Sequence, residues 1–144
     1  MILFVSFGGK MSETIHLNEN TNKIQVVGKL RQEIIDLLGI TLVAGDILMY
    51  PGAIKHIQRK RPDDFNKYFQ RIPEIISEPD YVGVHPTEHD SVEFVKVIDN
   101  DVLVAVKFSP EGYLYLSSMY ALTPVKVPKR LKSGRLIAVP KNNP

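Results

Sequence analysis

Three mainly apolar runs, separated by two short turns, occupy the stretch from residue 92 to residue 120, where the period of the sequence changes from helical to two. The runs are residues 92–98, 102–108 and 113–120, and the turns are Asp99-Asn-Asp101 and Ser109-Pro-Glu-Gly112. Alternation with a period of two is typical of strands, and turns this short join neighbouring antiparallel strands. The sequence therefore predicts an antiparallel meander of three strands.

Helical patterns precede the meander. Helices are predicted over residues 28–39, 51–61 and 62–76, the last one divided at Pro73, and a short helix over residues 128–134 follows the meander. Short strands are predicted at residues 23–27, 47–50, 81–84 and 135–139. Helices first and strands later indicate an α+β fold, with the helices packed on one face of an antiparallel sheet and the other face open to solvent or a ligand.

The length of 144 residues fits one domain. We expect a flexible N-terminal segment at residues 1–22, in which residues 11–22 are a polar loop, a single α+β domain at 23–139 and a tail at 140–144. The apolar run at residues 1–7 has no positive region before it, so it does not fit a secretory signal. It is an edge strand, a disordered start, or a leader if translation begins at Met11.

The amino-acid composition excludes several kinds of functional site. The chain has no cysteine, which excludes disulfides, thiol catalysis and Cys-ligated metals. No apolar run is long enough to span a membrane. The net charge of +2 is unevenly distributed, because residues 122–144 carry six basic side chains and no acid. This basic end indicates either an anion-binding surface or a solvated, charged C-terminus.

The predicted helix at residues 51–61 combines a histidine with several cations. His56, Arg59 and Lys60 fall within about one turn of each other on one side of the helix. An imidazole moves protons near neutral pH, and cations attract phosphate. The same pattern also fits an ordinary amphipathic helix with a solvated basic face.

Alternation assigns side chains to the two faces of the meander. Val102, Val104, Val106 and Phe108 are expected in the core, which places Lys107, Tyr115, Ser117 and one of Glu93 or Lys96 on the open face. In the third strand, Leu114, Leu116, Ser118 and Tyr120 are expected opposite Tyr113, Tyr115, Ser117 and Met119. A bulge would reverse these assignments. The open face is either an RNA-binding surface or a plain solvated surface.

No metal site is expected. His85 and His89 have a spacing that brings two rings to one metal only on a helix, and Pro86 disfavours a helix there. The chain also lacks a glycine-rich phosphate loop, since Gly8-Gly9-Lys10 has no further part of that motif. We therefore expect no cofactor.

Five blocks of sequence carry a resemblance to a known family. They are Gly45-Asp-Ile-Leu-Met-Tyr-Pro-Gly-Ala-Ile-Lys-His-Ile57, Ile72-Pro-Glu-Ile-Ile-Ser-Glu-Pro-Asp-Tyr-Val-Gly83, Val95-Lys-Val-Ile-Asp99, Leu116-Ser-Ser-Met-Tyr120 and Arg130-Leu-Lys-Ser-Gly-Arg135. In this order they resemble phage-type barnase–EndoU–colicin–RelE-like nuclease domains, which occur in prophages and other mobile elements. The resemblance covers residues 26–139 and implies N-terminal helices packed on a four-stranded antiparallel sheet.

The resemblance also implies a function. It implies a toxin-like, metal-independent endoribonuclease that leaves a 2′,3′-cyclic phosphate and acts on tRNA or other cytoplasmic RNA of a bacterial host. The implied catalytic residues are His56, Lys96, Ser117 and Arg135, and the implied RNA-binding or phosphate-binding residues are Arg59, Lys60, Lys107, Ser118 and Arg130. A cognate inhibitor or antitoxin protein is an expected partner, and no membrane association is expected.

One position departs from the pattern of some relatives. Those relatives continue the helix as His-Ile-x-x-Arg-His-Pro, whereas this chain has Arg61 where the second histidine would stand. Catalysis would then depend on His56 with a glutamate such as Glu93 or with a lysine. The alternative is a catalytically inactive nuclease-like domain that binds RNA or a protein partner.

Overall fold

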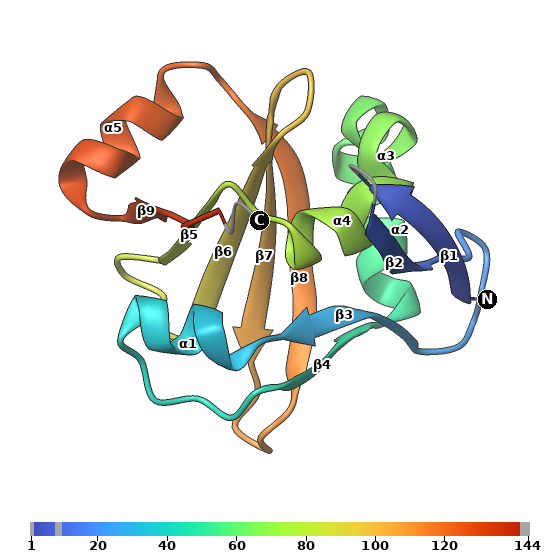
Figure 1. Cartoon of the computed structure of the whole chain (residues 1–144). Coiled ribbons are helices and arrows are strands. Elements are labelled where there is room, and N and C mark those ends of the chain that lie inside the picture. Colours follow the sequence, from blue (N-terminus) through green and yellow to red (C-terminus); the bar gives the residue numbers. More distant parts are fainter. Residues whose placement is uncertain (1, 8–9, 142–144) are drawn as a thin grey trace.

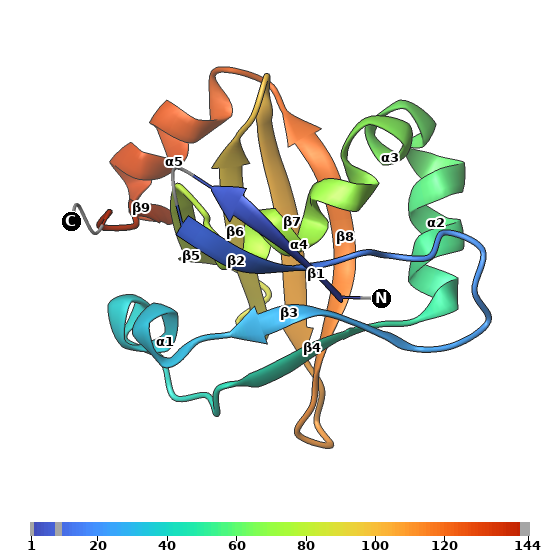
Figure 2. The same cartoon turned by 45° about the vertical axis from the view of Figure 1, so that its right-hand side comes forward.

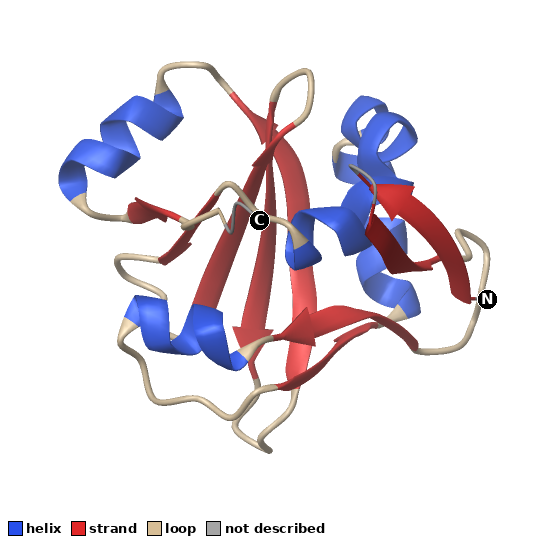
Figure 3. Ribbon diagram, viewed as in Figure 1, coloured by secondary structure: helices blue, strands red, loops and turns tan. Residues whose placement is uncertain are grey.

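The structure is a computed structural model that describes residues 2–7 and 10–141 (Figure 1). Its elements in chain order are β1 (Ile2–Phe7), β2 (Lys10–Ile15), β3 (Gln25–Leu30), α1 (Gln32–Leu38), β4 (Gly45–Met49), α2 (Pro51–Lys60), α3 (Pro62–Tyr68), the 3-10 turn η1 (Phe69–Arg71), α4 (Ile72–Ser77), β5 (Tyr81–Val84), β6 (Ser91–Val97), β7 (Asp101–Phe108), β8 (Leu114–Leu122), α5 (Lys126–Ser133) and β9 (Leu136–Ala138). Figure 3 shows helices and strands mixed along the chain, which confirms the α+β class.

The predicted meander forms the centre of the main sheet. In it, β7 pairs antiparallel with β6 on one side and with β8 on the other. The full strand order of the sheet is β3-β4-β8-β7-β6-β5-β9. The expected four-stranded sheet is therefore wrong in strand number, since this sheet has seven strands. Short strands extend the meander on both sides. On one side β4 pairs parallel with β8 at two positions, and at the far edge on the other side β9 pairs antiparallel with β5.

The main core lies on one face of this sheet, under α2, α3 and α4 (Figures 1 and 2). Val102, Val104 and Val106 of β7 are buried there, as the alternation predicts. The other face is not fully open, because α5 covers part of it. Val127 of α5 packs over Leu103 in a second buried cluster. The apolar side chains of β6 and β7 on that face are shielded from water by α5.

A bulge in β8 changes the predicted faces of the third strand. Ala105 pairs with Ser118 and Val106 pairs with Leu116, so Ser117 is an extra residue without a partner on β7. An extra residue shifts everything after it to the other face. Met119 is consequently buried in the main core, and Tyr120 packs against the second cluster instead, so the predicted placement of Ser118, Met119 and Tyr120 is wrong.

The N-terminal segment forms a separate two-stranded antiparallel sheet of β1 and β2. The loop expected over residues 11–22 is therefore wrong for residues 11–15, because pairing with β1 gives this polar stretch backbone partners that its composition does not reveal. Of the expected flexible segment and tail, residues 1, 8–9 and 142–144 lie outside the described residues. Within the described chain, no helix is long and apolar enough to cross a membrane.

Candidate active site

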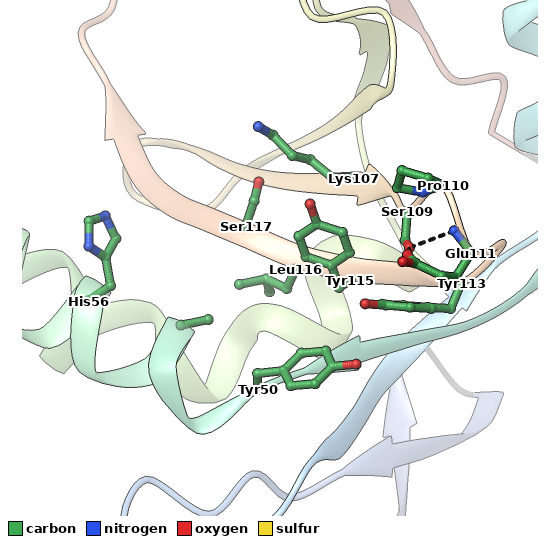
Figure 4. A pocket seen from close by; sticks show the side chains of 11 residues that line it. Tyr50, His56, Lys107, Ser109, Pro110, Glu111, Tyr113, Tyr115, Leu116 and Ser117 are labelled. Atoms are coloured by element: carbon green, nitrogen blue, oxygen red, sulfur yellow. Dashed lines mark hydrogen bonds between the residues drawn. The ribbon is translucent and has the colours of Figure 1, made fainter.

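A pocket of about 620 Å³ opens between α2 and the strands β7 and β8 (Figure 4). Its walls bring together three residues that the sequence singles out, His56, Lys107 and Ser117. The complete lining is Tyr50, Ala53, His56, Lys107, Ser109, Pro110, Glu111, Tyr113, Tyr115, Leu116 and Ser117. A volume of this size is in the range of small-ligand sites.

The position of His56 follows from how β4 runs into α2. β4 pairs with β8 only at Ile47 and Leu48, and Pro51 then begins α2, as predicted for the helix at residues 51–61. Ile54 and Ile57 point into the main core and fix the helix. His56 lies between them in sequence on the exposed side, beside β8 where β4 no longer pairs.

Ser117 lines the same pocket as Tyr115, two residues earlier on β8, as the alternation of the strand predicts. Its hydroxyl donates a hydrogen bond to the backbone carbonyl of Ala105 at 3.2 Å. Figure 4 shows His56 and Ser117 extending from α2 and β8 toward the same side of the pocket. A hydroxyl and an imidazole that converge on one cavity can address the same phosphate group.

Lys107 supplies the positive charge of the pocket. It stands opposite Tyr115 in the pairing of β7 with β8. Its ammonium nitrogen lies 3.8 Å from a carboxylate oxygen of the exposed Glu88, a long and solvated ion pair. Such pairs are weak, so an anionic ligand can compete for this cation.

The other cations of α2 lie outside the pocket lining. Arg59 and Lys60 are exposed in the last turn of the helix. Arg61 follows the helix, and its guanidinium carbon lies 4.9 Å from the centre of the Tyr120 ring. Ser118 is half-buried beside Ser117 and does not line the pocket.

Arg135 is not part of the His56 pocket. Its Nε and Nη2 donate to the two carboxylate oxygens of Glu93 at 2.8 Å each. This hydrogen bonding raises the pKa of Arg135, with burial acting in the opposite direction. Glu93 is 1% exposed and is not in the pocket lining, so the structure does not place it beside His56.

Arg135 and Arg130 line a second groove, of about 590 Å³, between α5 and the end of β5. Its lining is Val84, Pro86, Lys126, Lys129, Arg130, Ser133, Gly134 and Arg135. Within residues 15–141, whose side chains the structure describes, the cations of α5 have no ion pair, and the Nη1 atom of Arg130 is buried without a hydrogen-bond partner. This groove is the more basic of the two.

Lys96 lies on the opposite face of the sheet from Lys107, because it pairs with Val102, whose side chain is in the main core. Its Nζ donates to the backbone carbonyl of Glu78 at 2.9 Å and lies 3.9 Å from the carboxylate of Glu74 in α4. It shares its face with Phe94, two residues earlier in β6, which is buried in the main core. The structure therefore does not bring Lys96 to either groove.

Sequence reasoning missed four residues of the pocket wall: Tyr50, Ser109, Glu111 and Tyr113. A side-chain hydrogen bond with Tyr113 raises the pKa of Tyr50. Ser109 is buried and donates to the carboxylate of Glu111, which lowers the pKa of that carboxyl group. The spacing Tyr113, Tyr115, Ser117 was a usable signal, because residues two apart on a strand share a face.

Within the described chain, no cluster of three or more His, Asp or Glu side chains could hold a metal ion. A family model described as phage-Barnase-EndoU-ColicinE5/D-RelE like nuclease3 matches residues 24–129. The chain belongs to this nuclease family. No curated protein and no solved structure matches it significantly.

The match to this nuclease family covers the lining of the His56 pocket completely and that of the second groove in part. Residues 24–129 contain every residue that lines the His56 pocket, from Tyr50 to Ser117. Arg130 and Arg135 lie beyond its end. The His56 pocket is therefore the candidate active site of the nuclease domain, and the groove beside α5 is an adjoining surface.

Proposed function

We propose that this nuclease domain is a metal-independent endoribonuclease that forms a 2′,3′-cyclic phosphate. The observation that carries the proposal is the shared pocket of His56, Ser117 and Lys107. These side chains supply an acid–base group, a hydroxyl donor and a fixed cation. Together they cover the needs of phosphate transesterification without a metal.

In the proposed reaction the ribose 2′-oxygen attacks the adjacent phosphorus and the bond to the 5′-oxygen breaks. His56 accepts the proton of the 2′-hydroxyl, and the 5′-oxygen leaves with a proton from solvent or from the imidazolium. Lys107 and Ser117 stabilise the negative charge that builds up on the nonbridging oxygens. The products are a 2′,3′-cyclic phosphate and a 5′-hydroxyl, so no water is consumed in this step.

The proposed substrate is tRNA or another cytoplasmic RNA of a bacterial host, which would make the protein a toxin-like factor of a prophage or mobile element. An inhibitor or antitoxin protein is a proposed partner, since such a nuclease would harm the cell that makes it. The predicted phosphate-binding role of Arg130 fits the groove beside α5, where its cations remain available.

The alternative function is RNA binding without cleavage. One observation favours it: Arg61 stands where some relatives carry a second histidine, and its guanidinium lies over the Tyr120 ring. An arginine in that place cannot exchange protons near neutral pH, but it can hold a phosphate. The two functions differ in whether RNA is cut.

The deciding experiment incubates purified protein with end-labelled tRNA in excess EDTA. We expect cleavage products that end in a 2′,3′-cyclic phosphate, and we expect His56→Ala to be slower by about 10²- to 10⁴-fold. Lys55→Ala is the matched control, because Lys55 is the exposed neighbour on α2 that does not line the pocket. Intact tRNA with the wild-type protein, while binding persists, would support the alternative.

The groove beside α5 has its own test. Arg130→Ala should reduce the slope of log affinity against log salt by about 0.7 for single-stranded RNA, because one phosphate contact is lost. Lys23→Ala, in the exposed loop before β3, should leave the slope unchanged. An unchanged slope in Arg130→Ala would remove Arg130 from the RNA-binding surface.

A further inference from the structure

Three tyrosines gather at one end of the candidate active site. Tyr113 and Tyr115 come from the start of β8, and Tyr50 comes from the junction of β4 and α2. The ring centres of Tyr113 and Tyr115 are 5.9 Å apart, and those of Tyr50 and Tyr113 are 6.3 Å apart. Figure 4 shows the three rings at the end of the pocket away from His56.

The faces of the three rings remain accessible to a ligand, because the rings do not stack on one another. Their planes are inclined by 51° for the pair at β8 and by 47° for the pair with Tyr50, so neither pair is stacked. Tyr113 is 40% exposed, and Tyr50 and Tyr115 are half-buried. Three partly exposed aromatic rings are costly to leave in water and are typical of a surface that receives a ligand.

The surrounding structure holds the rings in place. Tyr115 is paired with Lys107 on one side and with Leu48 on the other. Tyr50 precedes Pro51 with extended backbone, and its ring lies beside that of Tyr113. The backbone that carries the rings is therefore already ordered before a ligand binds, which favours recognition.

The distance between the tyrosines and the catalytic side chains is also suited to a nucleotide. Tyr115 and Ser117 are two residues apart on β8, which corresponds to roughly 7 Å of extended chain. This separation is comparable with that between a phosphate group and the base of the same nucleotide. A phosphate beside Ser117 and Lys107 would thus put a neighbouring base against the tyrosine rings.

We propose that Tyr50, Tyr113 and Tyr115 form a base-stacking subsite that selects unpaired RNA as the substrate of this pocket. The inference rests on the proposed function, because it places the base next to the phosphate that His56 would act on. A base can enter between tilted rings only if it is not already stacked and paired in a helix. Stacking tolerates every base, since each has a π face, so selection is for single-stranded structure rather than for one sequence.

The test uses a single-stranded 2′-O-methyl hexanucleotide, which lacks the nucleophilic hydroxyl and is not cut. Tyr113→Ala should weaken its binding by about 5- to 150-fold, the range for loss of one stacked base. Tyr113→Phe should restore the affinity, because the ring rather than the hydroxyl provides the stacking. The same sequence in a duplex should bind no better to the wild type than to Tyr113→Ala.

An abasic series then locates the contact. Removing one base from the probe should weaken wild-type binding at a single position, and that loss should disappear in Tyr113→Ala. Val97→Ala is the surface control, because Val97 is the exposed last residue of β6 and pairs with Asp101, at the end of β7 away from Lys107. Equal affinity of wild type and Tyr113→Ala, or equal loss of every abasic probe in both proteins, would overturn the inference.

The outcomes separate this inference from the proposed function. Cleavage of tRNA with unchanged probe binding in Tyr113→Ala would leave the nuclease function standing and remove the base subsite. Weakened probe binding without any cleavage by the wild type would remove the nuclease function and keep the tyrosines as an RNA-binding surface.

Discussion

The guanidinium of Arg135 donates two hydrogen bonds of 2.8 Å each to the carboxylate of Glu93, which lies 42 residues earlier in the sequence. The Glu93 side chain is almost fully buried, whereas that of Arg135 is about one-fifth exposed. The pair therefore joins the residue that precedes β9 to the middle of β6. The pair occupies the Nε–Nη2 edge of the guanidinium, and Glu93 already balances the charge of Arg135 before any phosphate binds.

This pairing predicts that Arg135→Ala destabilises the protein. The change would leave the Glu93 carboxylate buried without its partner, which typically costs about 3–5 kcal/mol in the free energy of unfolding. Urea unfolding followed by circular dichroism measures the loss. Replacing both residues by methionine should recover most of it, since no buried charge remains. Loss of activity in Arg135→Ala at unchanged stability would instead support a direct role on phosphate.

Lys107 and Lys96 form a natural pair for testing which face of the sheet acts on RNA. Lys107→Ala should slow cleavage by about 10- to 100-fold, because a cation beside the reacting phosphate is lost. Lys96→Ala should leave the cleavage rate unchanged and lower the free energy of unfolding by about 1–3 kcal/mol, because the Glu78 carbonyl loses a charged donor. The opposite result would place the active site on the face covered by α4, where Lys96 lies.

The central meander could be predicted because each strand carries its own signal. An apolar run such as residues 102–108 and the short polar turns beside it can be recognised from neighbours in sequence alone. The strands at the sheet edges are short, and their place in the sheet depends on partners far away. β4, for example, joins β8 through two residue pairs only, Ile47 with Leu114 and Leu48 with Tyr115. No local pattern marks such a contact.

The candidate site could be predicted in part for the same reason. His56 and Ser117 were identified from chemistry, but their meeting depends on the packing of α2 against β8, two elements far apart in sequence. The bulge in β8 also reversed the faces predicted for Ser118 and Met119. A one-residue slip is invisible in a sequence that reads as a regular strand. The partner of Arg135 could not be predicted either, because the sequence does not show which glutamates are buried and which are exposed. The fold decides that Glu93 is covered, and burial then requires its pairing.

Acid should weaken the link between the C-terminal end and β6. Burial alone would raise the pKa of Asp80, but hydrogen bonds from the Lys141 ammonium and the Val97 backbone N–H outweigh it, so the pKa is lowered. A carboxyl group with a lowered folded-state pKa contributes stability above its unfolded-state pKa of about 3.9, and this is lost as the pH falls through the folded-state value.

Urea midpoints at pH 7 and pH 3 measure this contribution. Asp80→Asn should be less stable than the wild type at pH 7 and should lose less stability on going to pH 3, because it has no carboxyl group to protonate at this position. Glu19→Gln, in the exposed loop before β3, serves as a control for the removal of one acid. An identical pH dependence in Asp80→Asn and the wild type would mean that Asp80 does not contribute to acid sensitivity.

Gly83 is the position in β5 where a side chain should do the most harm. A Cβ atom there would lie 1.8 Å from the backbone carbonyl oxygen of Arg135 and 2.9 Å from its carbon. Backbone atoms cannot turn aside as a flexible side chain can, so β9 would have to move away from β5 at the pair of Gly83 with Leu136. That movement would also pull Arg135 from Glu93.

We therefore expect Gly83→Ala to destabilise the protein by at least the roughly 1–3 kcal/mol that is typical of overpacking, as measured by urea unfolding. Gly52→Ala is the matched control, because Gly52 lies in the first turn of α2 with no atom within 4 Å of the added Cβ. This control should be stabilising by up to about 1 kcal/mol, since alanine is the better helix former. If Gly83→Ala unfolds at the wild-type urea midpoint, β9 is not held against β5, and the Arg135 anchor must be stabilised by other contacts.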